Sequence, residues 1–133
     1  MLYQLDTNIV IYAVEGQAPF QQRARNYIAA LESAGHRFVV SELTWTECLV
    51  IPLRTGNGPL LLDYERFFLG PNLTTVPFTS GVHRRAALIR ATYNYGLGDS
   101  LHLAIAVEHR LDRFLSNDNR LVGFPDIFVE VLP

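Results

Sequence analysis

Short apolar segments alternate along this chain with longer stretches whose hydrophobic residues have helical spacing. Each apolar segment is short and continuous enough to be a strand buried on both faces of a sheet. Strands separated by helices pair in parallel, because the chain must cross back over the sheet between them. The sequence therefore predicts an α/β fold: a single three-layer domain over residues 1–133, with a parallel sheet of about five strands covered by helices on both faces. We expect the strands at residues 2–5, 37–40, 73–76, 113–115 and 127–132.

Capping residues and chain breaks place the helices between these strands. Asp6 should cap a short first helix, and Asp99 should cap the helix that follows the Gly96-Leu97-Gly98 break. Ser41 should begin another helix, whose pattern Pro52 and Gly56 interrupt. The remaining spacing predicts helices over residues 9–14, 20–34, 60–69, 80–95 and 100–109.

Composition limits the kind of protein that this chain can be. Of its 133 residues, 49% are hydrophobic and 18% are charged, which argues against disorder. The apolar runs fall well short of the roughly 20 residues that a membrane span needs, and the amino terminus lacks the pattern of a signal peptide. We therefore expect a cytoplasmic protein that does not enter a membrane. The single cysteine, Cys48, excludes an internal disulfide and a cysteine-rich zinc site.

Four acidic residues lie where such a chain has little structural use for charge. Asp6 and Asp118 follow predicted strands, Asp99 begins a helix, and Glu47 lies inside one. The carboxyl ends of parallel strands meet at one edge of a sheet, where ligands bind in folds of this kind. Carboxylates gathered there would repel one another unless a divalent cation such as Mg²⁺, which takes oxygen ligands, lay between them. These residues, called the four acids below, therefore predict a metal site suited to phosphodiester chemistry.

Each of the four acids also has a structural explanation. Asp6 and Asp99 stand at favoured helix-capping positions, and Asp118 lies in a segment rich in turn-forming residues. Glu47 is harder to explain in this way, because its spacing from neighbouring apolar residues places it on an apolar helical face, where an unpaired carboxylate is costly. Pairing with Arg54 is the alternative for Glu47.

The arginines suit a polyanionic substrate. The formal net charge is −2, but when the four acids are set aside, nine of the 13 acidic residues remain against 11 basic residues, and all of these are arginine. An acidic cleft in a mildly basic body would hold a polyanion through the body and bridge it to the cleft by metal. Such a run of arginines is more often a solvated helix face, although arginine also binds phosphate well. The candidates for substrate binding are Arg84, Arg85, Arg90 and Arg120.

Four fragments occur in a fixed order along nearly the whole chain. They are Leu5-Asp6-Thr7-Asn8, the segment 41–47 (SELTWTE), the segment 99–106 (DSLHLAIA) and the segment 115–118 (LSND). In this order and at this spacing, the fragments resemble the PIN domain family, and within it the short toxin nucleases of VapC type from toxin–antitoxin pairs. The resemblance implies a PIN-like fold and a metal-dependent endoribonuclease that hydrolyses RNA phosphodiester bonds.

The same resemblance implies site residues, cofactor and partners. Asp6, Glu47, Asp99 and Asp118 would be the catalytic acids that bind Mg²⁺ or Mn²⁺. The resemblance also implies an antitoxin partner that covers the acidic cleft, and a homodimer. The polar positions that support the site would be Asn8 and Ser116. The chain departs from the family pattern after Asp118, where the family often has an aromatic residue and this sequence continues Asn119-Arg120-Leu121.

Glu42 and the histidines are competing candidates for the site. Glu42 could take the place of Glu47, but it falls near a helix start and suits a capping or surface charge better. A metal-free ribonuclease could use histidines instead. His102 and His109 share a helix face, yet a spacing of seven residues is too long for one proton relay. His102 lies one turn from Asp99 and could instead support the acids.

Two other classes of function compete with the nuclease. An aspartate-based phosphoryl-transfer domain would need a lysine beside the phosphoryl group, and this chain has no lysine. The second alternative is a noncatalytic PIN-like interaction module that keeps the sheet without its chemistry. The presence of all four acids argues against this second alternative.

Overall fold

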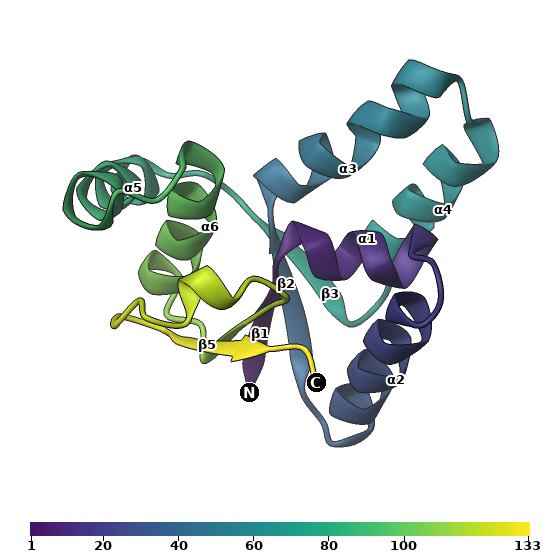
Figure 1. Cartoon of the computed structure of the whole chain (residues 1–133), viewed down its shortest axis with the longest axis horizontal. Coiled ribbons are helices and arrows are strands. Elements are labelled where there is room, and N and C mark those ends of the chain that lie inside the picture. Colours follow the sequence, from purple (N-terminus) through teal and green to yellow (C-terminus); the bar gives the residue numbers. More distant parts are fainter.

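The computed structural model describes all 133 residues and contains the predicted parallel sheet. Five strands lie in the order β3-β2-β1-β4-β5, and every neighbouring pair is parallel (Figure 1). The central strand, β1, is buried from Tyr3 to Leu5, as expected for a strand covered on both faces. The predicted fold class is therefore confirmed. The strands are β1 (Leu2–Leu5), β2 (Arg37–Ser41), β3 (Leu73–Val76), β4 (Arg113–Ser116) and β5 (Phe128–Val131).

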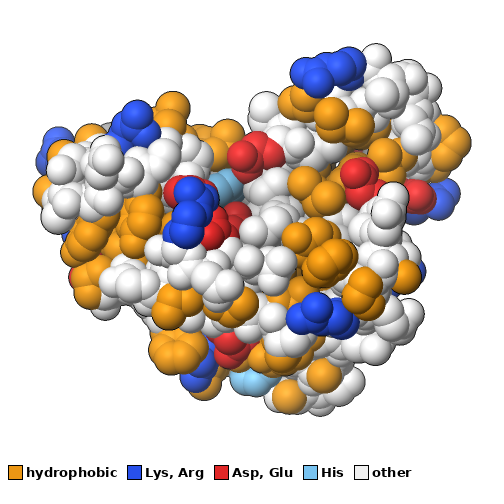
Figure 2. All heavy atoms as spheres, in the orientation of Figure 1, with side chains coloured by type: hydrophobic (Ala, Val, Ile, Leu, Met, Phe, Trp, Pro, Cys, Tyr) orange, Lys and Arg blue, Asp and Glu red, His pale blue; other side chains and the backbone are white.

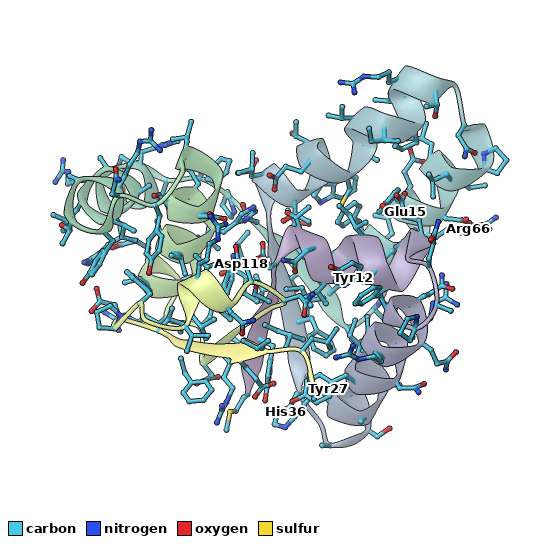
Figure 3. All side chains as sticks on the ribbon, in the orientation of Figure 1. Tyr12, Glu15, Tyr27, His36, Arg66 and Asp118 are labelled. Carbon is cyan, nitrogen blue, oxygen red and sulfur yellow. The ribbon has the colours of Figure 1, made fainter.

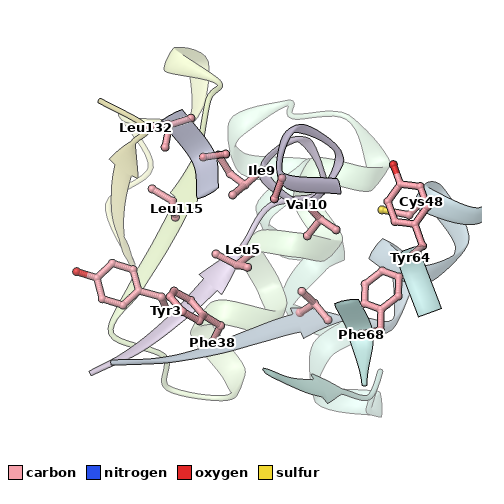
Figure 4. Packing of buried hydrophobic residues seen from close by; sticks show 13 residues of the cluster. Tyr3, Leu5, Ile9, Val10, Phe38, Cys48, Tyr64, Phe68, Leu115 and Leu132 are labelled. Carbon is pink, nitrogen blue, oxygen red and sulfur yellow. The ribbon is translucent and has the colours of Figure 1, made fainter. Parts of the chain in front are cut away.

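Helices cover both faces of the sheet because successive strand residues point to opposite sides. Phe38 and Val40 pack with the first four helices, whereas Val39 packs with the last two. Figure 4 shows the first of these cores, where Leu5 and Leu115 of the sheet meet residues of the first, third and fourth helices. The helices are α1 (Thr7–Glu15), α2 (Phe20–Ser33), α3 (Glu42–Thr55), α4 (Gly58–Phe68), α5 (Ser80–Tyr93) and α6 (Leu97–Glu108), with a 3₁₀ turn η1 (Asn119–Leu121). None of them combines the length and the apolar character that crossing a membrane requires.

Two details of the predicted helices were wrong. Of the two breaks predicted for α3, Gly56 does end the helix, in the left-handed conformation at φ 65°, whereas Pro52 does not interrupt it. Pro52 is buried on the same helix face as Thr44 and Cys48, so packing there outweighs the hydrogen bond that proline cannot make. At the other boundary, α6 begins at Leu97 rather than after Asp99, so that Asp99 lies in the first turn and does not cap the helix.

The three middle strands deliver their following residues to one edge of the sheet. β1 ends at Leu5, β4 at Ser116 and β2 at Ser41, and all three run in the same direction. The next residues are Asp6, the segment 117–118 and the start of α3. The prediction that Asp6 and the segment carrying Asp118 emerge at a shared edge is therefore confirmed.

Candidate active site

Asp6 is held on three sides at the end of β1. Its Oδ1 accepts a hydrogen bond from the backbone amide of Thr7 at 2.8 Å, so Asp6 does cap α1. Its Oδ2 accepts from the Ser116 hydroxyl at 2.7 Å and, at 3.4 Å, from the side-chain amide of Asn8. Burial raises the pKa of Asp6; the charge on Asp99 adds to this, while His102, Ser116 and the Thr7 amide oppose it. Capping is therefore only part of what surrounds this buried carboxyl, which is 6% exposed.

Asn8 and Ser116 tie the end of β1 to the end of β4. The Ser116 hydroxyl donates to Asp6 and also accepts from the backbone amide of Asp118 at 3.0 Å. Asn8 Oδ1 accepts from the amide of Asn117 at 3.3 Å. Both residues thus occupy supporting positions between two of the four acids.

Glu47 reaches the same region from α3 through a single oxygen. Its Oε1 accepts a hydrogen bond from the Thr7 hydroxyl at 2.6 Å and from His102 Nε2 at 2.7 Å. Burial raises the pKa of Glu47, but the hydrogen bonds from His102 and Thr7 outweigh it, so that the pKa is lowered. These contacts make His102, rather than Arg54, the partner of Glu47.

The predicted burial of Glu47 was wrong. Its side chain is 39% exposed, and the apolar neighbours Val50 and Ile51 are exposed too. The buried face of α3 is formed instead by Thr44, Cys48 and Pro52. Glu42 lies apart from Glu47, because its carboxylate accepts from the backbone amide of Phe78 at 2.5 Å.

Asp99 and Asp118 lie on the other side of the cleft. Asp118 accepts from the backbone amide of Arg120 at 3.0 Å, so it does form the expected turn. The Arg120 guanidinium also lies across both of its oxygens and lowers the pKa of Asp118. Burial raises the pKa of Asp99, with Arg120 opposing and Asp118 adding to the effect. The hydrogen-bond partner of Asp99 is Arg120 Nη2, at 3.4 Å.

Figure 2 shows acidic side chains, a histidine and an arginine around a hollow between the α5–α6 side and the α1–α3 side of the molecule. Figure 3 places Asp118 beside the start of η1, across from α1 and Tyr12. Asn117 bridges the two segments, since its side-chain amide donates to the Tyr12 hydroxyl at 3.2 Å. The hollow is therefore bordered by segments that are far apart in the sequence.

The four acids suit a divalent cation by chemistry more than by their present positions. All of them offer carboxylate oxygens, the ligands that Mg²⁺ and Mn²⁺ prefer. The charge of Asp99 adds to the raised pKa of Asp6, and the charges of Asp118 and Glu47 add to the raised pKa of Asp99. However, no three acidic, histidine or cysteine side chains converge closely enough to enclose an ion. Arg120 engages both oxygens of Asp118. The Arg120 side chain would therefore have to move before Asp118 could join the other acids around an ion.

The predicted substrate-binding arginines are not grouped together. Arg120 contacts two of the four acids. Arg85 pairs with Glu108 at 2.8 Å, and Arg90 donates to the carbonyl of Tyr95 at 3.1 Å. Arg84 is exposed on α5. The arrangement therefore puts one of the four arginines at the cleft and the other three on or near α5.

Thr7 and Thr44 were not predicted from the sequence as site residues, and His102 was named only as a residue that could support the acids. The three side chains form a buried polar network with Glu47: Thr7 contacts the hydroxyl of Thr44 at 3.0 Å and His102 Nε2 at 3.3 Å. His102 is 2% exposed. The available signals were the position of Thr7 next to Asp6 and the three-residue spacing of His102 from Asp99, which places both on one helix face.

A parallel sheet with clustered acids at its carboxyl edge is the arrangement of an α/β domain that binds its ligand there. The family model of the PIN domain matches residues 3–126. The chain therefore belongs to the PIN domain family. The comparison with curated proteins gives no match.

Solved structures of similar fold come from toxin–antitoxin complexes and a toxin. A chain of VapBC2 from Rickettsia felis, bound to a DNA fragment from its promoter, is 17% identical with a TM-score of 0.82, and the match covers 100% of both chains. A toxin–antitoxin complex from Klebsiella pneumoniae is 24% identical, with a TM-score of 0.71 and 94% of each chain covered. A VapC toxin of Mycobacterium tuberculosis, described as cleaving the sarcin–ricin loop, is 12% identical with a TM-score of 0.74, covering 95% of this chain and 98% of that one. At these identities the likeness establishes the fold alone.

Proposed function

We propose that this chain is a metal-dependent endoribonuclease and the toxin of a VapBC-type toxin–antitoxin pair. The observation that carries the proposal is the placement of carboxyls from separate segments at one edge of the sheet, where Thr7 contacts both Asp6 and Glu47 and Arg120 contacts both Asp99 and Asp118. Membership in the PIN domain family and the fold shared with VapC-type toxins support it. The RNA substrate would place the activity in the cytoplasm.

The four acids would hold Mg²⁺ or Mn²⁺. When bound, the ion would polarise the scissile phosphate and lower the pKa of a bound water. Asp6 is positioned for this by Ser116 and Asn8, which fix its Oδ2. Glu47 is oriented by His102 and Thr7 through Oε1, which leaves its Oε2 for a ligand. The chain's own part is therefore to present oriented carboxylates, with no side-chain nucleophile required.

Arginines would supply the phosphate contacts. Arg120 is placed beside Asp118 and Asp99, so it would be the closest to the scissile phosphate. Arg84 on α5 is exposed and would contact a more distant part of the RNA. Arg85 and Arg90 would have to leave Glu108 and the Tyr95 carbonyl before they could bind phosphate. Such contacts add affinity without base selectivity.

Besides covering the acidic cleft with one segment, the antitoxin partner would fill a second groove, away from the four acids. This groove has a volume of about 490 Å³ and lies between α1, α2 and α4. Its apolar lining, including Ile28 and Phe67, is bordered by the charged residues Arg25, Glu32, Asp63 and Arg66. The similar fold of chains from toxin–antitoxin complexes supports a protein partner there. A homodimer would use other exposed apolar residues, such as Val50, Ile51 and Leu53 on α3.

A noncatalytic interaction module is the alternative. It is favoured by one observation, that no three candidate ligands converge closely enough to enclose an ion. In that case the four acids would serve only the fold and partner binding. The two functions differ in whether RNA is cut.

The experiment is cleavage of mixed structured RNA by the purified chain in Mg²⁺, in Mn²⁺ and in EDTA. Asp6→Asn and Asp99→Asn keep the side-chain size and remove the charge, while Asp126→Asn removes an exposed acid outside the cleft and is the matched control. We expect metal-dependent cleavage by the parent and by Asp126→Asn, and none by the other two variants although they fold. Cleavage that survives EDTA or both substitutions would reject the role of the four acids. Binding of RNA without cleavage under any metal would favour the interaction module.

A further inference from the structure

Arg120 is the one predicted substrate-binding arginine that contacts any of the four acids, and it contacts two of them. Its Nε donates to Asp118 Oδ1 at 3.0 Å and to Oδ2 at 3.1 Å, and its Nη2 donates to Oδ2 at 2.5 Å. The same Nη2 reaches Asp99 Oδ2 at 3.4 Å. One guanidinium therefore spans the two carboxylates on one side of the cleft and engages both oxygens of Asp118.

The position of Arg120 allows its side chain to leave without disturbing the fold. The side chain is 74% exposed, whereas Asp118 and Asp99 are 21% and 28% exposed. The next residue, Leu121, is fully buried and anchors η1 to the core. An exposed ion pair of this kind contributes little to stability, so the guanidinium can exchange one anion for another at small cost.

We propose that Arg120 is an exchangeable counter-cation of the cleft. In the absence of divalent metal it neutralises Asp99 and Asp118; when metal takes these carboxylates, Arg120 moves to a phosphate of the RNA. The inference rests on the proposed function, because it takes Asp99 and Asp118 as metal ligands. Its chemical basis is that a guanidinium binds carboxylate and phosphate through the same bidentate geometry.

This role gives one substitution two effects of opposite sign. Removing the guanidinium frees Asp118 and Asp99 for the ion, so metal should bind more tightly. Removing it also deletes a phosphate contact, so RNA should bind more weakly. A residue that only supports the fold would weaken both, and a residue that only binds RNA would leave metal affinity unchanged.

The test is calorimetric titration of Mn²⁺ into the full chain without RNA, which needs no turnover. We expect Arg120→Ala to bind Mn²⁺ about two- to fivefold more tightly than the parent, the range given by the usual strength of an exposed ion pair. Arg120→Lys, which keeps the charge but not the bidentate fork, should lie between them. Arg37→Ala is the control, because it removes an exposed arginine at the opposite end of the sheet.

RNA affinity is measured separately in Mn²⁺ and in EDTA, by fluorescence anisotropy of a labelled single-stranded oligonucleotide with phosphorothioate linkages that resist cleavage. In Mn²⁺ we expect Arg120→Ala to bind it several-fold more weakly than the parent, whereas in EDTA, where Arg120 stays on the acids, the two should differ less; Arg37→Ala should bind it like the parent in both. Parental RNA affinity of Arg120→Ala in Mn²⁺ would overturn the transfer to phosphate. Unchanged Mn²⁺ affinity would overturn the competition, and weaker Mn²⁺ binding would show that Arg120 holds Asp118 ready for metal instead. A parent protein that binds no Mn²⁺ would overturn the proposed function together with this inference, whereas the other outcomes leave that function standing.

Discussion

The two sides of the acidic cleft hold their carboxylates in different ways. On what we call the fixed side, Asp6 is buried and accepts hydrogen bonds from Thr7, Ser116 and Asn8. On the open side, Asp99 and Asp118 are partly exposed and share the guanidinium of Arg120. Under the metal site that we propose, one ligand would be set by the fold and two would adjust to the ion.

The origin of this difference lies in the sheet. The fixed side is built where the adjacent strands β1 and β4 end, so backbone pairing sets the distance between Asp6 and Ser116. The open side is built from the first turn of α6 and from η1, which are joined at the cleft by the side chain of Arg120. Strand ends are positioned by many backbone hydrogen bonds, whereas a surface ion pair is screened by solvent.

The largest expected effect concerns Glu47, whose Oε1 is oriented by hydrogen bonds from Thr7, on the fixed side, and from His102. His102→Leu removes a hydrogen-bond donor from Glu47 and should weaken Mn²⁺ binding and cleavage by about 10- to 100-fold, as for residues that orient metal ligands. His102→Gln keeps a donor and should recover part of the loss. Mn²⁺ titration and RNA cleavage measure both effects, with exposed His83→Gln as the control. Parental Mn²⁺ affinity in His102→Leu would remove His102 from the site.

Ser116→Ala tests how firmly the fixed side is held. The substitution removes the 2.7 Å hydrogen bond to buried Asp6 and the acceptor for the Asp118 amide. We expect the free energy of unfolding to fall by about 1–3 kcal/mol, because a buried carboxylate loses its partner. Urea denaturation measures it, with Ser33→Ala at the exposed end of α2 as the control. A loss no greater than that of the control would mean that Asp6 is not fixed by Ser116.

Arg120→Ala is the matching test of the open side. Since the Arg120 guanidinium in its ion pairs with Asp118 and Asp99 is exposed, the free energy of unfolding in metal-free buffer should fall by much less than it does in Ser116→Ala. The loss should shrink at high salt, which screens exposed charges. If this variant lost more stability than Ser116→Ala, the comparison between the two sides would be reversed.

The smallest expected effect is a difference in pH dependence. Burial raises the pKa of Asp6 above 3.8, so the folded chain holds this proton more tightly than the unfolded chain does. Stability from this group is therefore present at low pH and is lost as the pH rises from 3.8 through the raised pKa. Asp118 behaves oppositely, because Arg120 lowers its pKa: its stabilising contribution is lost as the pH falls below 3.8.

Unfolding of the parent and of Asp6→Asn in EDTA, measured across this range, separates the two carboxyls. The variant should lose the part of the decline above pH 3.8 that belongs to Asp6, keep the part that belongs to Asp99, whose pKa is also raised, and keep the acid-side loss that belongs to Asp118. Identical slopes for the parent and the variant would show that Asp6 is not destabilised by its burial.

The sequence predicted the fixed side better than the open side, for a physical reason. Asp6 and Ser116 follow or end short apolar strands, and parallel pairing brings such strand ends together whatever the loops do. Asp99 was misplaced as a cap because α6 begins at Leu97 rather than at the expected Ser100, with Gly98 inside the helix. The contact between Arg120 and Asp99 joins residues 21 positions apart, and local spacing gave no sign of it.

Glu47 shows a second limit of sequence patterns. Its apolar neighbours predicted a buried face, but α3 turns Val50 and Ile51 outward and buries Thr44 and Cys48 instead. A helix whose apolar residues are spread around its axis does not specify which face is buried. The pairing of Glu47 with His102 depends on the packing of α3 beside α6, which no short motif encodes.

The most direct test of the metal-site proposal is anomalous scattering from crystals of the chain soaked in Mn²⁺. We expect an Mn²⁺ peak in the cleft with carboxylate oxygens of Asp6 and Asp99 about 2 Å away, and the Arg120 guanidinium displaced from Asp118. A cleft without Mn²⁺, or Mn²⁺ bound only to acids elsewhere while Arg120 stays on Asp118, would contradict the assignment of the four acids as a metal site.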